Sequence, residues 1–152
     1  MGSIIRVGAN KPIGELANWR MSKKKKLNNF LMNFTNSPKY QDNPILKQTF
    51  EFSIDIIKYS ELLDSSRKYV LSKQLIRSGT SIGANVKEAQ NAESKADFVH
   101  KIKIALKEAD ETEYWLFLCQ NIETYPNPDG LLEKLNGILK MLNKIVSTVK
   151  SK

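Results

Sequence analysis

The sequence predicts an all-α protein, an up-down-up-down antiparallel four-helix bundle with a mostly disordered basic N-terminal tail. Apolar residues recur at helical spacing through residues 43–152, and short polar connections separate the periodic stretches. Residues 1–42 show no sustained apolar periodicity, and their charge is typical of a segment that does not fold alone. We therefore expect a tail, 1–42, followed by one bundle domain, 43–152.

Residues that favour helix ends predict where the four helices begin. Asn43 before Pro44 is typical of an N-cap and a first helical residue. A pair of serines divides the first two helices, and Ser94 with Asp97 three residues later resembles a capping box. Asn127 and the proline after it indicate the start of the last helix. The expected helices are 44–63, 66–91, 95–122 and 128–150.

The apolar positions inside these helices follow steps of three and four residues, which is the seam of a helix bundle. In the last helix they are Leu131, Leu135, Ile138, Leu142, Ile145 and Val149. In the first helix they are Ile45, Thr49, Phe52, Ile56, Tyr59 and Leu63. In the third they are Phe98, Ile102, Ala105, Ala109 and Leu116, interrupted by Glu113. Because the connections are short, sequential helices are expected to be antiparallel neighbours.

Two helices carry apolar residues on a second face. Leu46, Phe50, Ile54 and Ile57 form a stripe beside the first seam, and Ile104, Trp115, Leu118 and Ile122 lie nearly opposite the third. Exposed patches of this kind usually mark association. We expect a homo-oligomer whose interface contains Leu46, Phe50, Ile54, Ile104, Trp115, Leu118 and Ile122. The alternative is that the tail or a tilted neighbour covers these residues.

The stretch "IRSGTSIGANVKEAQ", residues 76–90, has two glycines four residues apart, which fits neither a Walker loop nor a dinucleotide-binding loop. As a helix, it places Arg77, Ser81, Asn85 and Glu88 on one face that borders the core seam. We call these four residues the polar stripe. Its two glycines lie on a further face, where the absence of side chains lets another helix approach closely.

The polar stripe has a structural and a functional interpretation. In the first, Arg77 pairs with a facing carboxylate, Glu113 or Asp55, while Ser81 and Asn85 form hydrogen bonds across helices, because buried polar groups need partners. In the second, the stripe lines a ligand groove or the pore of an oligomer. Both interpretations stay open at the level of sequence.

Positive charge is concentrated in two places. Residues 1–42 contain eight basic and two acidic residues, so the tail carries +6 of the net charge of +8. In the bundle, antiparallel order brings lysines of all four helices to one end. The candidate contacts to nucleic-acid phosphates are Lys23, Lys24, Lys25, Lys26, Lys87, Lys101, Lys103, Lys107, Lys140, Lys144 and Lys150.

Several classes of function find no support in the residues. Cys119 and His100 are the only cysteine and histidine, so one chain builds neither a disulfide nor a Cys/His metal cluster. Ser81 has no histidine within helical reach to act as a base. No stretch is apolar over the length of a membrane span. We expect a soluble, cytoplasmic protein that is not an enzyme and holds no metal or cofactor.

Two segments, "QLIRSGTSIGANVKEAQ" and "DFVHKIKIALKEADETEYWL", resemble the bacterial four-helix-bundle proteins encoded in intervening sequences of 23S ribosomal RNA genes. A more distant resemblance links them to accessory proteins of diversity-generating retroelements. The matching positions are Arg77, Ser78, Ser81, Ile82, Asn85, Val86, Glu88, Phe98, Ile104, Ala105, Glu111 and Glu113. The resemblance implies a small homo-oligomer, commonly a pentamer around a pore, without known catalytic activity and with RNA or ribonucleoprotein association as its leading suggested role.

Two functions follow as hypotheses. In the first, the protein is a non-catalytic, oligomeric accessory that binds structured RNA or a ribonucleoprotein through its lysine-rich end. In the second, it is a protein-interaction scaffold without nucleic-acid binding, and its charge serves solubility alone.

Overall fold

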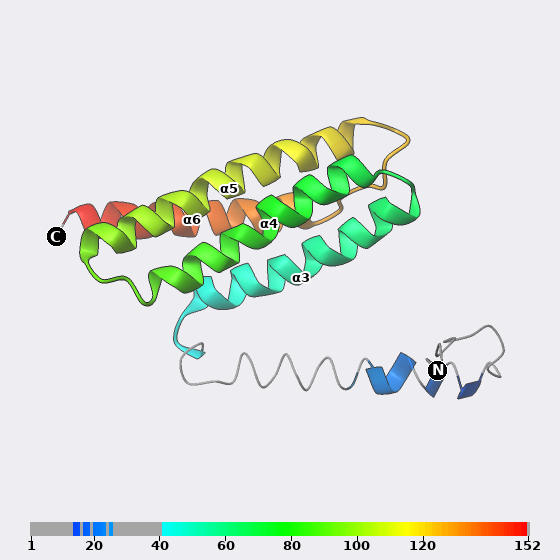
Figure 1. Ribbon diagram of the computed structural model, residues 1–152, viewed down its shortest axis with the longest axis horizontal. Helices are drawn as coiled ribbons and strands as arrows, with labels where there is room; N and C mark the ends of the chain where they lie inside the picture. The colour runs from blue at the N-terminus through cyan, green and yellow to red at the C-terminus, as the bar shows by residue number, and fades with distance from the viewer. Residues whose placement is uncertain (1–13, 16, 19, 24, 26–40, 152) are drawn as a thin grey trace, which may run out of the picture. The chain divides into compact units, whose positions relative to one another are not determined.

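The computed structural model describes residues 14–15, 17–18, 20–23, 25 and 41–151, and these residues contain helices and no strand. Four long helices follow one another (Figure 1): α3 (Pro44–Ser65), α4 (Tyr69–Ala89), α5 (Lys95–Asn121) and α6 (Leu131–Lys150). The predicted helical bundle is confirmed. The chain divides into two units, Met1–Gln41 and Asp42–Lys152, and the second holds the bundle. The predicted disorder of residues 1–42 falls mostly outside the described residues and stays a prediction.

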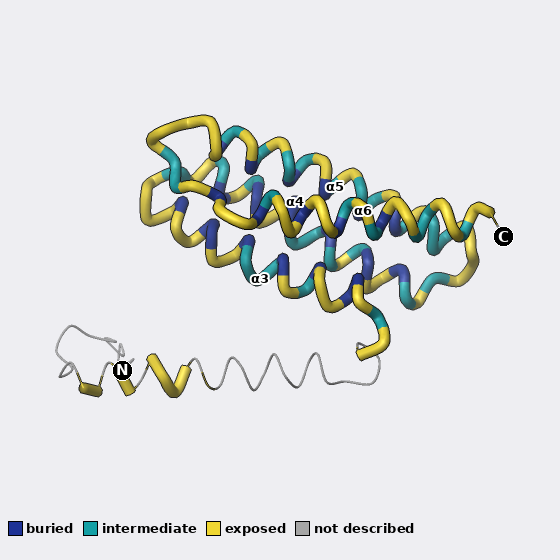
Figure 2. Tube along the Cα trace, turned by 180° about the vertical axis from the view of Figure 1, so that it is seen from behind, coloured by how far each residue is buried: buried dark blue, intermediate teal, exposed yellow. Residues whose placement is uncertain are grey.

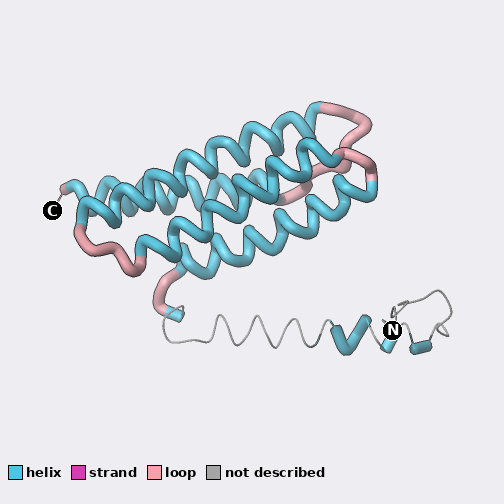
Figure 3. The backbone as a smooth tube through the Cα atoms, viewed as in Figure 1, coloured by secondary structure: helices cyan, strands magenta, loops and turns pink. Residues whose placement is uncertain are grey.

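The four helices form a closed ring of neighbours. α3 packs against α4, α4 against α5, α5 against α6, and α6 against α3. Figure 3 shows that the connecting loops lie at alternate ends, as expected for antiparallel neighbours. The C-terminal ends of α4 and α6 therefore lie at the same end of the bundle as the start of α5 (Figure 1).

The helix boundaries differ from the predicted ones where the backbone turns through left-handed conformations. α4 begins at Tyr69 rather than at residue 66, because Arg67 has a φ of 59°. α6 begins at Leu131 rather than at residue 128, and its N-cap is Gly130 with a φ of 76°. The cap at Ser94 is confirmed, since its hydroxyl accepts the N–H of Asp97 at 3.0 Å.

The predicted cap at Asn43 is wrong in one respect. Its side chain makes no capping hydrogen bond to α3, and its amide nitrogen instead donates to Oε1 of Gln90 at 2.9 Å. This bond ties the start of α3 to the residue that follows α4. α4 ends at Ala89, two residues earlier than expected.

The predicted seams form the core, which appears in Figure 2 as a dark inward-facing stripe on each helix. All six seam residues of α3 are buried, as are Leu131, Leu135, Ile138 and Leu142 of α6. Each large aliphatic side chain buried in this way contributes about 1.5–3 kcal/mol relative to exposure. In α5 the seam passes through Thr112, which is fully buried, and not through Glu113.

The two glycines of α4 face α3, and they set a close approach of the two helices. A Cβ atom on Gly79 would lie 2.9 Å from both Cγ atoms of Ile56. A Cβ atom on Gly83 would lie 3.1 Å from the hydroxyl of Ser53 and 3.2 Å from the carbonyl oxygen of Thr49. The prediction that missing side chains admit a neighbouring helix is therefore confirmed.

The loop between α5 and α6 contacts α3 and the residue that precedes α4. The hydroxyl of Tyr59 in α3 donates to the carbonyl oxygen of Pro126 at 2.5 Å. The ammonium group of Lys68 lies 4.5 Å from the ring centre of Tyr125 and 3.3 Å from the hydroxyl of Thr124. These contacts hold the N-terminal end of α6 against the bundle.

Candidate functional site

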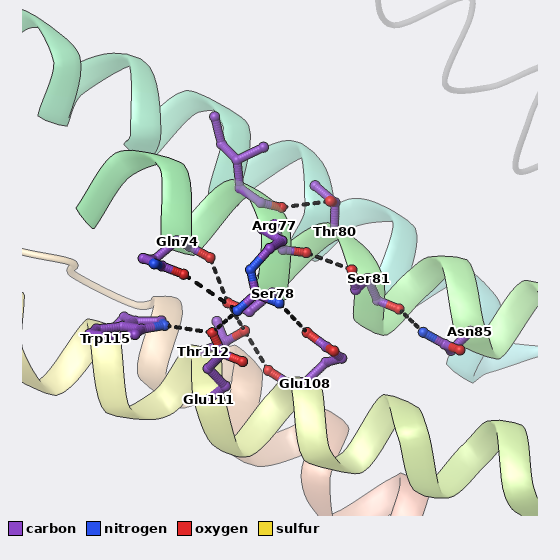
Figure 4. Close-up of polar contacts among 11 residues, drawn as sticks. Gln74, Arg77, Ser78, Thr80, Ser81, Asn85, Glu108, Glu111, Thr112 and Trp115 are labelled. Atoms are coloured by element: carbon purple, nitrogen blue, oxygen red, sulfur yellow. Dashed lines mark hydrogen bonds and ion pairs between the residues drawn. The ribbon is translucent and has the colours of Figure 1, made fainter. Parts of the chain in front are cut away.

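The polar stripe of α4 contacts α5 through Arg77 (Figure 4). The guanidinium pairs with the carboxylate of Glu111 and lies 3.9 Å from that of Glu108. The same carboxylate oxygen of Glu111 accepts the indole N–H of Trp115 at 3.0 Å. Glu111 therefore fixes an arginine of one helix and a tryptophan of its own helix.

The predicted partners of Arg77, Glu113 and Asp55, are wrong. Glu113 is two residues from Glu111, about 200° around the helix, and therefore points away from α4. Asp55 instead pairs with Lys134 of α6 at 2.5 Å. The Arg77 side chain is 56% exposed, so the expected buried ion pair is a surface pair.

The predicted hydrogen bonds of Ser81 and Asn85 across helices are also wrong. The Ser81 hydroxyl donates to the carbonyl oxygen of Arg77 at 2.6 Å, and the Asn85 amide donates to that of Ser81 at 2.8 Å. Both bonds stay within α4, because each side chain reaches the carbonyl one turn back. The hydrogen bonds of Ser81 and Asn85 therefore stay within α4 and do not join it to α5.

A buried polar contact also crosses between α4 and α5, through Ser78 and Thr112, and the sequence did not predict this pair. Their hydroxyl oxygens lie 3.0 Å apart in the buried core. Each also lies within hydrogen-bond distance of a carbonyl on its own helix, that of Gln74 for Ser78 and that of Glu108 for Thr112. The signal was present, because Thr112 follows the seam of α5 in steps of three and four residues.

Glu88 at the other end of the polar stripe pairs with Lys101 of α5 at 2.6 Å. The hydrogen bond that the Lys101 ammonium group donates to the Glu88 carboxylate raises the pKa of Lys101. The polar stripe therefore contacts α5 at its two ends, through the Arg77 pairs and through Glu88.

The candidate lysines of the bundle are less concentrated at one end than expected, because Lys107 and Lys140 lie near the middle of α5 and α6. Lys87 lies in the last turn of α4 and Lys101 is paired as above. Five more are exposed on α5 and α6: Lys103, Lys107, Lys140, Lys144 and Lys150. Within residues 41–151, none of these five forms a salt bridge with a carboxylate. Of the tail lysines, Lys23 and Lys25 are described and exposed, whereas Lys24 and Lys26 lie outside the described residues.

The apolar residues expected at an oligomer interface divide into two partly exposed faces. Phe50 and Ile54 of α3 are half-buried beside Ile57 and Ile76, which are 42% and 38% exposed. On α5, the half-buried residues are Ile104, Trp115 and Leu118, and Ile122 is 40% exposed. Leu46 was wrongly placed at the surface: it is 4% exposed, because it packs inside the bundle.

The Cys119 thiol and the Tyr59 hydroxyl are buried. Burial raises the pKa of the Cys119 thiol and that of the Tyr59 hydroxyl, so both stay protonated and unreactive at neutral pH. Across the described residues, no group of three or more His, Cys, Asp or Glu side chains is placed to hold a metal ion. Nor does any helix in this part of the chain have the length and apolar character to cross a bilayer.

One open groove runs along the seam between α3 and α6. It has a volume of about 470 Å³, with Phe52 and Ile138 at its base and Glu51, Glu133 and Lys134 at its rim. The rim carries charges of both signs and lacks a nucleophile or a histidine. We assign no chemistry to this groove.

These features define a small all-α bundle protein with ion pairs between α4 and α5 and with exposed lysines on α5 and α6. The 23S rRNA-intervening sequence protein family matches residues 41–144, and the chain belongs to this family. A comparison with curated proteins gave no match.

A solved structure supports the family assignment. The chain is similar to a protein of unknown function from the S23 ribosomal protein family of Bacteroides thetaiotaomicron VPI-5482, with 42% sequence identity and a TM-score of 0.64. The match covers 67% of this chain and 97% of that chain. The shared region is thus nearly the whole of that protein.

Proposed function

We propose that this protein is a non-catalytic, cytoplasmic accessory protein that assembles with itself and binds structured RNA or a ribonucleoprotein. The observation that carries the proposal is the group of five exposed lysines on α5 and α6, which have no carboxylate partner among the described residues of the bundle. Cations that no protein carboxylate neutralises attract phosphates, and the counterions released on binding supply much of the affinity. The family description refers to intervening sequences of 23S rRNA, so a fragment of this RNA is the first one to test as a partner.

The accessory role also rests on what the bundle contains. The Cys119 thiol is buried and stays protonated, Arg77 and Glu88 form surface ion pairs, and the Ser81 hydroxyl donates to a carbonyl group of its own helix rather than to a base. We also propose that the chain is distantly related to accessory proteins of diversity-generating retroelements.

Salt dependence tests the RNA proposal. Filter binding of a structured ribosomal RNA fragment should weaken by roughly 10³-fold or more between about 50 and 200 mM salt if six or more phosphates are contacted. The double variant Lys140→Glu with Lys144→Glu should bind more weakly and show a shallower salt slope. The control, Lys58→Glu with Lys73→Glu, changes charge equally at exposed positions of α3 and α4 and should bind more tightly than the test variant.

We propose in addition a homo-oligomer, with the pentamer as the assembly that the resemblance implies. The two partly exposed apolar faces support it, because water contact with such faces is unfavourable. Light scattering should give a multiple of the 17.3 kDa chain mass. Ile57→Glu and Ile122→Glu should each lower that mass, whereas Leu62→Glu, which lies outside both faces and is 49% exposed in the wild type, should not.

The scaffold is the second candidate, and the same two apolar faces favour it. The two experiments separate the candidates. A protein that assembles but binds no RNA even at about 50 mM salt is a scaffold, and the proposal of an RNA-binding accessory is then rejected.

A further inference from the structure

The outer face of α5 carries lysines in its first half and aromatic side chains in its second half. At 100° per residue, Lys103, Lys107 and Tyr114 lie within about 40° of one another, and Phe117 lies about 60° to one side of Tyr114. All four are exposed, and the two rings keep 58% and 46% of their surface open. We call these four residues the α5 track.

The α5 track borders the apolar face of the same helix. Trp115 and Leu118 belong to that face, and Trp115 shares Glu111 with Arg77 of α4. Phe117 is rotated by about 100° from Leu118 and by about 160° from Trp115, whereas Tyr114 is about 100° from Trp115 but only about 40° from Leu118. Phe117 therefore lies off the apolar face, and Tyr114 lies at its edge.

The ring of Tyr114 packs against a neighbouring ring. Its ring meets that of Trp115 edge-on, with centroids 5.1 Å apart and planes inclined by 67°. Trp115 is fixed in turn by its bond to Glu111. A ring held at the surface of a helix offers a flat face on which another planar group can stack.

We infer that the α5 track binds unpaired nucleotides of single-stranded RNA, with bases stacked on Tyr114 and Phe117 and phosphates held by Lys103 and Lys107. Stacking on aromatic side chains combined with a row of cations is how proteins hold single strands without reading sequence. The inference rests on the proposed function and names the kind of RNA that the protein prefers. Asp110 lies between the two halves and repels phosphates from the aromatic half.

Tyr114 and Phe117, the aromatic half of the α5 track, should not contribute to the binding of a double helix. Its bases are stacked on each other and cannot open onto a protein ring, so a duplex contacts the lysines alone. Lys140 and Lys144, exposed on the neighbouring helix α6, attract either form of RNA. The two forms should therefore respond differently to loss of the rings.

Fluorescence anisotropy with two labelled probes tests the inference on the full chain. One probe is an oligouridylate of about 12 nucleotides, and the other is an RNA duplex of the same length. Tyr114→Ala combined with Phe117→Ala should weaken binding of the single strand by about tenfold or more, since each stacked base is worth about 1–3 kcal/mol. Duplex binding should change by less than about twofold, because the lysines remain.

Two control variants keep the result interpretable. Tyr69→Ala combined with Leu62→Ala removes equally exposed apolar side chains of α4 and α3 and should leave both probes unaffected. Tyr114→Phe should bind the single strand like the wild type, because stacking needs the ring and not the hydroxyl. Circular dichroism measures whether each variant keeps its helices, and light scattering measures whether it keeps its assembled mass.

The possible outcomes are distinct. If the wild type binds both probes and loss of the rings weakens both equally or neither, the inference is rejected while the proposed function stands. If loss of the rings alters the assembled mass and leaves the single-strand affinity unchanged, the rings contact protein and the inference is rejected. If the wild type binds neither probe even at about 50 mM salt, the proposed function and the inference fail together.

Discussion

α4 meets its two neighbours in different ways. Toward α3 it presents Gly79 and Gly83, and backbone and side chains approach to the limit set by van der Waals contact. Toward α5 it presents a buried hydroxyl contact through Ser78 and, at the margin, ion pairs of Arg77 and Glu88. Among the described residues, no salt bridge joins α3 to α4. The α3–α4 interface has one buried polar contact of its own, from the Ser72 hydroxyl to the carbonyl oxygen of Ser60 at 3.2 Å. It differs from the α4–α5 interface in its close glycine packing and in the absence of ion pairs among the described residues.

The difference has an energetic consequence. A packed interface does not accommodate an added methyl group without strain, which costs about 1–3 kcal/mol. An exposed ion pair contributes about 0–1 kcal/mol, because water and salt screen it. We therefore expect the α3–α4 interface to dominate stability, and the polar groups of the α4–α5 interface to fix which residues lie opposite one another.

The largest effect is expected at the glycine interface. Gly79→Val should lower the free energy of unfolding by about 1–3 kcal/mol, because its side chain would overlap that of Ile56. The matched control is Gly137→Val on α6, where no heavy atom of the described residues lies within 4 Å of the added Cβ and the change should be within about 0.5 kcal/mol. Urea denaturation measures both. Equal stability of the two variants would contradict the steric account.

An intermediate effect is expected at the buried hydroxyls. Thr112→Val keeps the shape of the side chain but removes its hydroxyl, leaving Ser78 without its partner across the interface. The loss should be about 1 kcal/mol in urea denaturation. Thr148→Val is the control, because Thr148 is exposed and its hydroxyl bonds only to its own helix; a loss as large as that at Thr112 would show that burial is not the cause.

The smallest effect is expected at the surface ion pair. Arg77→Ala should lower the free energy of unfolding by no more than about 1 kcal/mol, and the loss should shrink further at high salt. Thermal denaturation at low and high salt measures it. A loss of about 3 kcal/mol or more, independent of salt, would indicate a buried pair instead.

The residues show where prediction from sequence succeeds and where it stops. Spacing in steps of three and four identified the buried seams, because burial depends on the face that each helix turns inward. It did not identify the partner of Arg77, because the height at which two antiparallel helices meet is a tertiary property. A difference of two residues replaces Glu111 with Glu113 on the opposite side of α5.

The remaining misses have local causes. The late start of α6 follows from the left-handed backbone of Gly130, which competes with a cap at the earlier Asn127-Pro128 pair. Leu46 looked exposed on a helical wheel of one helix, yet the bundle encloses it. Neither effect is visible until neighbouring elements are placed.

Because the loop before α6 is held by contacts to the rest of the bundle, we expect protection from amide hydrogen exchange to vary along this helix. Its N-terminal turn is held through Pro126 and Tyr125, and Leu131 and Leu135 are buried, whereas Ile145 and Val149 near its other end are only half-buried. Segments with few buried contacts open locally at low free-energy cost. Protection from exchange should therefore fall from Leu135 toward Val149, and Lys144 and Lys150 lie on the part of the helix that opens most readily.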